Sequence, residues 1–318
     1  MRETVKKLLP FASLIVLFVF LCVASPYFLR AGNLSSVIRQ TTVITIMAVG
    51  MTVVIASAGI DLSVGSIVGM TGVCGVMLIT GHYSTIAALL GAIVVGIACG
   101  AFNGAVITFL KIPPFVATLG ALGMYRGLTL LMTKGQPVVP PLGADGRPDT
   151  SFGVLANGDI LPWIPLPLVF IIAVGLLIHW VLNHTKIGRY AYAIGSNREA
   201  ARCCGIQIWL YTIIIYALNG ALTGMAGMID AARLVTGQPT AGGGYELSVI
   251  AAVVIGGGSL SGGQGTVLGT IVGSLIMGLL SNGCNLLRID PFIQQVIIGA
   301  VIVLAVSFDE FQKRRAAD

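Results

Sequence analysis

Two acidic residues stand at the boundaries of long apolar segments, where ionisable side chains are rare. Asp61 lies within the sequence Gly-Ile-Asp-Leu-Ser-Val-Gly at residues 59–65, and Glu246 opens a later apolar segment. A carboxylate at the start of a helix can cap it by accepting hydrogen bonds from its free amides. A carboxylate at membrane depth can instead line or gate a path for polar solutes. The sequence leaves both roles open for both residues.

Three asparagines, Asn103, Asn219 and Asn282, lie in or beside segments rich in glycine and aliphatic residues. An amide in hydrocarbon needs a hydrogen-bond partner, which either a neighbouring helix or a sugar hydroxyl could supply. Arg126, inside another apolar segment, is costly there unless it is paired, and the sequence does not identify its partner. The asparagines and the two carboxylates are the candidate residues for a translocation path or gate.

The pentapeptide at residues 260–264, Leu-Ser-Gly-Gly-Gln, has the signature sequence of ABC ATPases. Such an ATPase also needs a P-loop, Gly-x4-Gly-Lys-Ser/Thr, whose amides and lysine hold the phosphates. The sequence contains no Gly-Lys pair, and the pentapeptide lies between two apolar segments without room for a soluble nucleotide-binding domain. We therefore interpret it as a glycine-rich hinge or tight turn, and we expect no ATPase site in this chain.

No residue pattern indicates a metal site, a cofactor or covalent catalysis. The six cysteines include no Cys-x-x-Cys, and the three histidines lack ligand-type spacing. No Ser/His pair, paired aspartates or His-Glu-x-x-His supports an intramembrane enzyme. The net charge of +6 fits membrane orientation better than binding of nucleic acid, because the basic residues gather in particular polar connections.

A polar stretch at residues 196–205 separates two long apolar segments. Ser196 and Glu199 have the spacing of a capping box, with serine at the N-cap and glutamate at the third helical position. Gly205 follows where a helix C-terminus favours a residue with positive φ. The stretch therefore predicts a helix of about two turns that is capped at both ends and lies outside the bilayer. A short helix with arginines that joins two membrane spans is typical of a docking element.

The composition is that of an integral membrane protein. Of the 318 residues, 56% are hydrophobic and 9% are charged, whereas soluble domains have about 25% charged residues. A membrane-spanning helix needs about 20 apolar residues. Ten segments meet that length or approach it, and the eighth runs into three consecutive glycines: residues 8–27, 40–58, 62–80, 84–110, 113–133, 162–183, 208–228, 246–258, 266–284 and 291–308.

Glycine accounts for 42 of the 318 residues, and some glycines recur every four residues. Gly96, Gly100 and Gly104 do so in one segment, and Gly220 and Gly224 do so in another. Small residues at this spacing let two helix backbones approach closely in lipid. We expect both faces to pack against other helices.

Ten spans place both ends of the chain on one side of the membrane. With the N-terminus inside, eleven basic residues lie on the inner side and six on the outer side, as the positive-inside rule requires. We therefore expect cytoplasmic termini, a cytoplasmic loop at 184–208 and an irregular external loop at 134–162. The basic start and the apolar run to Ala24 resemble a signal peptide, but we favour an uncleaved first span because so many spans follow.

An internal repeat divides the chain into approximate halves at 1–133 and 162–308. Lys-Ile-Pro-Pro-Phe at 111–115 matches Arg-Ile-Asp-Pro-Phe at 288–292, and Asp61 matches Glu246 within a similar tetrapeptide. The topology puts the two matched segments on opposite sides, so the halves would have five spans each in inverted orientation. Inverted repeats are typical of transporters, with the substrate path between the halves. The alternative is chance similarity between glycine-rich helices.

Four segments together resemble the inner-membrane permeases of ribose/galactose-type sugar ABC importers. The likeness extends from residue 40 to residue 308, and Glu199, Ala200, Ala201 and Gly205 have the spacing of the coupling loop in such permeases. The apolar-proline tail that often follows that loop is missing. The four segments are GIDLSVG at 59–65, KIPPFVATLG at 111–120, GRYAYAIGSNREAAR at 188–202 and VIGGGSLSGG at 254–263.

The resemblance implies an all-α membrane protein of the ABC importer permease type, with residues 1–318 in one transmembrane domain. It implies transport of a monosaccharide, such as ribose or another pentose or hexose, across the bacterial inner membrane by alternating access. Glu199, Ala200, Ala201 and Gly205 would form the ATPase-coupling loop. The implied partners are membrane lipid, a second permease copy, a separate or fused ABC ATPase, and a periplasmic or lipid-anchored sugar-binding protein.

Two other functions fit parts of the sequence. A branched-chain amino-acid or nucleoside ABC permease would share the fold and the coupling loop. An ion-coupled secondary carrier would share the inverted repeat and the broken spans. Such a carrier needs ligands for a coupling ion, and the sequence offers few beyond Asp61 and Glu246. Dependence of uptake on ATP distinguishes the carrier from both permeases.

Overall fold

A computed structural model describes residues 2–141, 151–161 and 164–317, and most of them lie in helices. Six described helices are long and apolar enough to cross a membrane, and four shorter apolar helices accompany them. Each of the ten predicted segments overlaps one of these helices. They are α1 (Arg2–Ala24), α2 (Ala31–Ala56), α3 (Val64–Thr80), α4 (Thr85–Phe109), α5 (Pro114–Thr133), α7 (Leu166–His184), α10 (Ile208–Leu234), α11 (Tyr245–Ile255), α12 (Val267–Leu286) and α13 (Pro291–Ala317). Helix α2 begins nine residues earlier than predicted, and α10 ends six residues later.

Two short helices, α8 (Lys186–Ser196) and α9 (Arg198–Cys203), connect α7 to α10. The prediction that Ser196 caps the polar helix is wrong, because Ser196 is the last residue of α8. Asn197 is the N-cap instead: its backbone is extended, and its side chain accepts a hydrogen bond of 2.9 Å from the Ala200 amide. The C-terminal prediction is confirmed, since Gly205 follows α9 with a φ of +79°.

Short elements occupy the connection between α5 and α7. They are the 3-10 helix η1 (Ser151–Gly153), α6 (Val154–Asn157), and strands β1 (Asp159–Leu161) and β2 (Ile164–Pro165), which pair antiparallel. The irregular loop predicted at 134–162 is thus partly ordered by local structure, and its residues 142–150 and 162 lie outside the described residues. Arg39 of α2 ties β1 to the bundle through an ion pair of 2.7 Å with Asp159.

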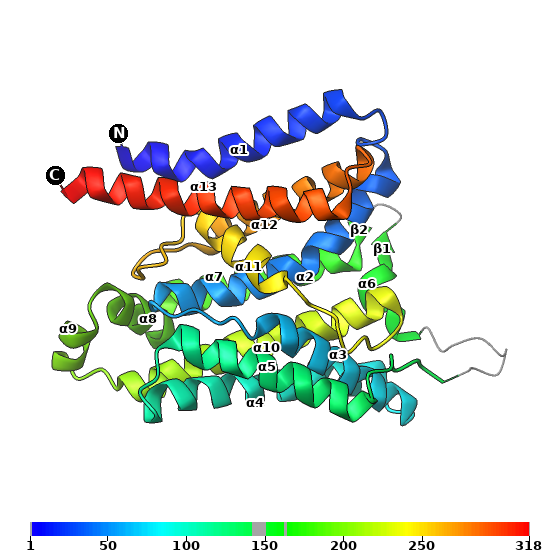
Figure 1. The fold of residues 1–318 in the computed structure, drawn as a ribbon, viewed down its shortest axis with the longest axis horizontal. Helices are drawn as coiled ribbons and strands as arrows, with labels where there is room; N and C mark the ends of the chain where they lie inside the picture. The colour runs from blue at the N-terminus through cyan, green and yellow to red at the C-terminus, as the bar shows by residue number, and fades with distance from the viewer. Residues whose placement is uncertain (1, 142–150, 162–163, 318) are drawn as a thin grey trace.

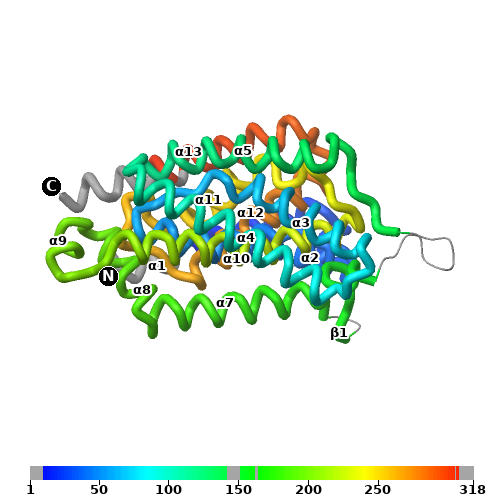
Figure 2. Tube along the Cα trace, turned by 90° about the horizontal axis from the view of Figure 1, so that it is seen from below, coloured from blue at the N-terminus to red at the C-terminus, as the bar shows by residue number. Residues whose placement is uncertain are grey.

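The long helices lie side by side, and the connections gather at the two ends of the bundle (Figure 1). The start of α1 and the end of α13 lie at the same end as α8 and α9, which we call the α9 end. The strands β1 and β2 lie at the opposite end, which we call the hairpin end, and the view in Figure 2 shows the same division. The polar connection at 184–208 and the described parts of that at 134–162 therefore lie at opposite ends of the bundle.

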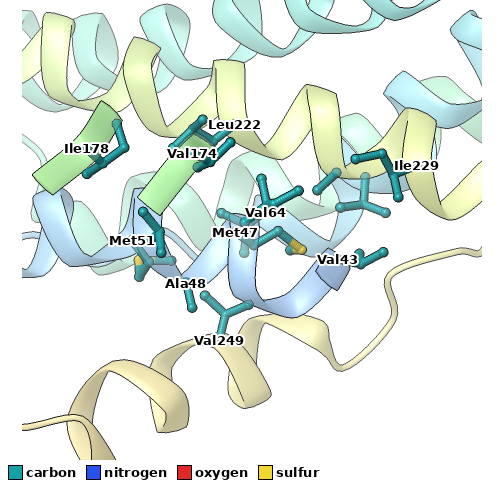
Figure 3. Close-up of a cluster of buried hydrophobic side chains, with 14 of the residues drawn as sticks. Val43, Met47, Ala48, Met51, Val64, Val174, Ile178, Leu222, Ile229 and Val249 are labelled. Atoms are coloured by element: carbon teal, nitrogen blue, oxygen red, sulfur yellow. The ribbon is translucent and has the colours of Figure 1, made fainter. Parts of the chain in front are cut away.

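The core forms around α2 and α10, which contact each other and most of the other helices. Figure 3 shows Met47 and Met51 of α2 among aliphatic side chains of neighbouring helices, including Ile178 of α7, Leu222 of α10 and Val249 of α11. Sixteen of the 26 residues of α2 are buried. From Val43 to Ala56 every residue of α2 except Ile44 is buried, as is typical of a helix at the centre of a bundle.

Glycines allow α4 and α10 to pack closely, as their spacing predicted. A Cβ atom on Gly100 would run into the backbone carbonyl of Tyr216, and Gly220 lies equally close to the carbonyl of Gly96. Gly224 packs in the same way against the backbone at Ala92. The two helices meet backbone to backbone, the arrangement that small residues permit in membranes.

The Gly100→Ala substitution is expected to destabilise the protein by about 1–2 kcal/mol, because overpacking pushes the two backbones apart. Gly120→Ala on α5 is the matched control, since a Cβ there meets nothing within 4 Å. The control should be neutral or slightly stabilising, because alanine favours helix over glycine. Denaturation midpoints in detergent measure both variants. Equal midpoints for the two would contradict the close packing of α4 on α10.

The pentapeptide at 260–264 lies in the connection between α11 and α12 and forms a tight turn, as predicted. Gly262 and Gly263 have φ angles of +87° and +73°, which residues with a side chain rarely adopt. The Gly262 amide donates to the Ser259 carbonyl at 2.9 Å and closes the turn. Helix α11 ends at Ile255, directly before the three glycines, so the eighth span is short as the sequence indicated.

The segments matched in the internal repeat have matching local geometry. Lys111 and Arg288 both have left-handed backbones, with φ angles of 55° and 56°, and each lies three residues before a helix begins, α5 and α13 respectively. The preceding helices α4 and α12 are capped alike: Ser84 and Thr266 each accept a hydrogen bond from the amide three residues later. In the repeat, α2 corresponds to α10, and α4 corresponds to α12. The packing of α10 on α4 therefore has its counterpart in the packing of α2 on α12.

Candidate functional site

Asp61 is the centre of a buried hydrogen-bond network in the linker between α2 and α3. Its side chain is 0% exposed. Its Oδ1 accepts hydrogen bonds from the amide and the hydroxyl of Ser63, at 3.0 and 2.6 Å. Its Oδ2 accepts from the Asn219 amide group on α10 at 3.0 Å. Asn103 on α4 lies at 3.4 Å from Oδ1 and donates to the Ser63 hydroxyl at 2.8 Å.

The network extends to α5. The Tyr125 hydroxyl of α5 donates to Asn103 Oδ1 at 2.8 Å. The backbone carbonyl of Ile60, next to Asp61, accepts from the hydroxyls of Tyr216 on α10 and Thr118 on α5, at 3.1 and 3.3 Å. Within the described residues, the ion pairs do not include Asp61, so hydrogen bonds alone offset the burial of its carboxyl group.

Three of the five candidate path residues thus converge in one place. The linker at 57–63 supplies Asp61, α4 supplies Asn103 and α10 supplies Asn219. The Asn219 Oδ1 atom is buried and has no hydrogen-bond partner among the described residues. This unmatched acceptor bears a burial cost of about 1–3 kcal/mol.

Glu246 lies apart from the Asp61 network, in the first turn of α11. It is half-buried, and its carboxylate lies against Gly65 in the first turn of α3. The carbonyl of Gly242, just before α11, also lies against Gly65. The N-terminal ends of α3 and α11 therefore meet. A carboxylate at a helix N-terminus is electrostatically favourable, so Glu246 suits this position.

Arg126 of α5 has a partner that the sequence did not reveal. Its Nη1 donates to the backbone carbonyl of Pro239 at 2.6 Å. Pro239 belongs to the segment at 235–244 that joins α10 to α11, and the guanidinium also lies against Gly69 of α3. Arg126 therefore fastens this non-helical segment to α3 and α5.

Asn282 pairs with a neighbouring helix. Its Nδ2 donates to Asn33 Oδ1 at 2.9 Å, and Asn33 Nδ2 donates back to Asn282 Oδ1 at 3.2 Å. The pair joins α12 to the first turn of α2. The structure does not bring Asn282 together with Asp61, Asn103 or Asn219.

The coupling-loop candidates lie on α9 and just after it, at the α9 end of the bundle (Figure 1). Glu199, Ala200 and Gly205 are exposed, whereas Ala201 is buried and anchors α9 to the bundle. The exposed arginines Arg198 and Arg202 flank the glutamate. A charged, rigid helix that projects from the end of an apolar bundle is suited to dock a soluble protein.

Helix α8 was not predicted, although the sequence contains a signal for it. Gly188, Ala191 and Ile194 recur every three residues and are buried, whereas Lys186 and Arg189 are exposed. This spacing is that of an amphipathic helix. Helices α8 and α9 contact each other, and α8 packs on α2, α7 and α10. Helix α8 therefore connects α9 to the central helices of the bundle.

Comparison with known proteins shows the family to which the chain is similar. Residues 33–306 match the family model described as branched-chain amino acid transport system / permease component. The chain is 40% identical to the ribose import permease protein RbsC of Escherichia coli (strain K12), over 93% of this chain and 91% of the relative. It is 42% identical to RbsC of Bacillus subtilis (strain 168), over 96% and 92%. No solved structure is significantly similar to the chain.

A further relative is the D-allose transport system permease protein AlsC of Escherichia coli (strain K12), which is 32% identical over 93% of this chain and 88% of its own length. These relatives are transport components, and the matches extend over nearly the whole chain. An ABC importer also comprises an ATPase and a binding protein, which are therefore partners of this chain. The chain belongs to this family of transport-system permeases, and it is a multi-pass transport subunit of an ABC importer in the bacterial inner membrane rather than an enzyme.

Proposed function

We propose that this permease moves a monosaccharide, such as ribose or a related pentose or hexose, across the inner membrane by alternating access. The observation that carries the proposal is the identity of about two residues in five with ribose import permeases over more than nine-tenths of the chain. The allose permease among the relatives widens the class to other monosaccharides. The family model has a branched-chain amino acid description, but the sugar permeases match this chain along nearly its full length.

The proposed docking site for the ATPase comprises Glu199, Ala200, Ala201 and Gly205, on the exposed α9 and its C-terminal turn. The α9 end would then be cytoplasmic, and so would the start of α1 and the end of α13, which lie at that end (Figure 1). The basic residues Arg198 and Arg202 on α9 agree with this orientation under the positive-inside rule. The hairpin end would face a binding protein that is periplasmic or lipid-anchored.

The proposed moving parts are two inverted halves. The matched geometry before α5 and α13, and the matched packing of α4 on α10 and α12 on α2, support this division. The N-terminal ends of the short helices α3 and α11 meet between the halves, the kind of place where transporters hold substrate. Asp61, Asn103 and Asn219 would form the gate of the path on the α3 side, and Glu246 would form it on the α11 side.

The proposed assembly has two copies of the permease. Large hydrophobic side chains are exposed on several helices, including Leu176 and Trp180 of α7, Leu131 of α5 and Val296 of α13. Lipid would cover most of this surface, and a second copy would cover part of it. The ATPase would be either a pair of subunits or one fused chain.

Reconstituted transport tests the proposed function. The permease, its ATPase and its binding protein would be placed in proteoliposomes, and uptake of radiolabelled ribose, allose, xylose and leucine would be measured. We expect sugar uptake that requires ATP and persists when ionophores collapse ion gradients. Uptake of leucine in preference to every sugar would contradict the substrate class. Uptake that an ion gradient drives without the ATPase would indicate a secondary carrier.

A further inference from the structure

Three segments that are distant in sequence meet at the α9 end of the bundle. They are the C-terminal turn of α8, the end of α2 with the residues after it, and the turn at 259–265 between α11 and α12. The turn includes the pentapeptide Leu-Ser-Gly-Gly-Gln, to which the function has so far given no role. We call this meeting point the glycine junction, because Gly195, Gly262 and Gly263 form its centre.

Helix α8 holds the turn through a side chain and through its backbone. The Tyr192 hydroxyl donates to the Gly265 carbonyl at 2.7 Å. One turn of helix later, the backbone of Gly195 lies against Gly262, and Ser196 lies against Gly263. Because Ser196 is followed directly by Asn197 and α9, any displacement of α9 acts on the glycine junction.

Gly195 allows a contact that no other residue would permit. A Cβ atom on Gly195 would run into the carbonyl of Ala56, and it would lie 2.6 Å from the amide of Gly263. Both obstacles are backbone atoms, which cannot move aside as a flexible side chain can. The Gly195 position therefore needs glycine for close approach to two segments at once.

The turn and α2 are joined directly at the same point. The Gly263 amide donates to the Ala56 carbonyl at 2.9 Å, which satisfies a carbonyl at the C-terminus of α2. Ala56 lies five residues before Asp61, so the bond is next to the linker that holds the buried network. Further along, the hydroxyls of Thr52 on α2 and Thr270 on α12 lie 2.6 Å apart. The end of α2 and the start of α12 are thus fastened together.

We propose that the glycine junction transmits movement of the docked ATPase from α8 to both halves of the permease, with Gly195 and Tyr192 as positioning residues. The inference rests on the proposed function, in which α9 docks the ATPase. Through Ala56, the movement reaches the linker that contains Asp61. Through the turn at 259–265, it reaches the end of α11 and the start of α12. One contact point therefore acts on both sides of the substrate path.

Two pairs of variants test the glycine junction. Gly195→Ala adds the obstructing Cβ, and Gly123→Ala on α5 is its control, because a Cβ there meets nothing within 4 Å. Tyr192→Phe removes only the hydroxyl, and Tyr190→Phe on the same helix is its control. Each variant would be reconstituted with the ATPase and the binding protein. Co-purification of the ATPase, sugar uptake, and stimulation of ATP hydrolysis by sugar-loaded binding protein would be measured.

We expect Gly195→Ala to retain the ATPase but to lose about tenfold in uptake and most of the stimulation, since it disturbs coupling rather than docking. Tyr192→Phe should lose about threefold in both for the same reason. If Gly195→Ala loses uptake only because it no longer co-purifies with the ATPase, its role is structural and the inference is overturned. If Gly195→Ala does not fold, Tyr192→Phe decides, because it leaves the packing of α8 unchanged.

The outcome separates the glycine junction from the function on which it rests. If the unmodified permease neither binds the ATPase nor takes up sugar, the proposed function fails. If the unmodified permease does both, and Gly195→Ala and Tyr192→Phe remain coupled like their controls, only the glycine junction is refuted.

Discussion

Glu199→Lys is expected to abolish sugar uptake while the permease still inserts into the membrane. Glu199 is exposed on α9 between Arg198 and Arg202, so reversing its charge creates a run of positive charge on the docking surface. Like charges at an interface cost several kcal/mol, so we expect affinity for the ATPase to fall about 100-fold. Asn197 rather than Ser196 caps α9, so Glu199→Lys changes the charge without breaking the capping box that the sequence predicted.

Co-purification with the ATPase and uptake in proteoliposomes measure this effect. Glu199→Gln is the matched variant, since it keeps the shape of the side chain and introduces no positive charge. It should fall between the unmodified protein and Glu199→Lys in both measurements. Asn197→Ala removes the cap and leaves every charge in place, so it reports how far loss of helix alone impairs docking. Normal uptake by Glu199→Lys would contradict the assignment of α9.

Asp61→Asn is expected to have the second large effect. Each of the Asp61 oxygens accepts hydrogen bonds, so an amide group in its place turns one acceptor into a donor. The new amide donor lies against Asn219 Nδ2, which is itself a donor. The Asn219 amide can turn over so that its unpaired Oδ1 accepts, but its Nδ2 is then buried without a partner, at about 1–3 kcal/mol. We expect a destabilisation of about 1–3 kcal/mol and a severe loss of uptake, because the hydrogen bonds between the linker and α10 would be rearranged.

The double variant Asp61→Asn with Asn219→Asp provides the control. It exchanges the carboxylate and the amide across the same contact, so the donor again faces an acceptor. We expect it to recover part of the stability that Asp61→Asn loses, because Ser63 and Asn103 still face an amide. Denaturation midpoints in detergent and uptake assays measure both variants. Unchanged stability and uptake in Asp61→Asn would show that the network does not hold the linker.

The spans could be predicted because hydrophobic length is a local property of the sequence. All ten predicted segments overlap a helix of the bundle, including the short α11 before three glycines. The tight turn at 260–264 and the positive φ at Gly205 were also predictable, since both depend on the backbone freedom of glycine. The cap of α9 was not, because Ser196 and Asn197 are both good caps and only the end of α8 decides between them.

The contacts of the candidate site could not be predicted, because they join residues far apart in sequence. Asn103 is 42 residues from Asp61, and Asn219 is 158 residues from it. Arg126 donates to a backbone carbonyl. Every residue has a backbone carbonyl, so the sequence does not indicate which of them accepts the hydrogen bond. Polar residues in apolar segments correctly marked candidates, but their pairing depends on how the helices pack.

Accessibility of α9 tests the central claim most directly. Cys203 and Cys204 are exposed at the end of α9, and the other four cysteines, Cys22, Cys74, Cys99 and Cys284, lie in or beside the bundle and can be replaced by alanine. A membrane-impermeant maleimide would be applied to inside-out and right-side-out vesicles, with and without the ATPase. We predict labelling only in inside-out vesicles, and protection when the ATPase is bound. Labelling in right-side-out vesicles would place α9 outside the cell and contradict the account.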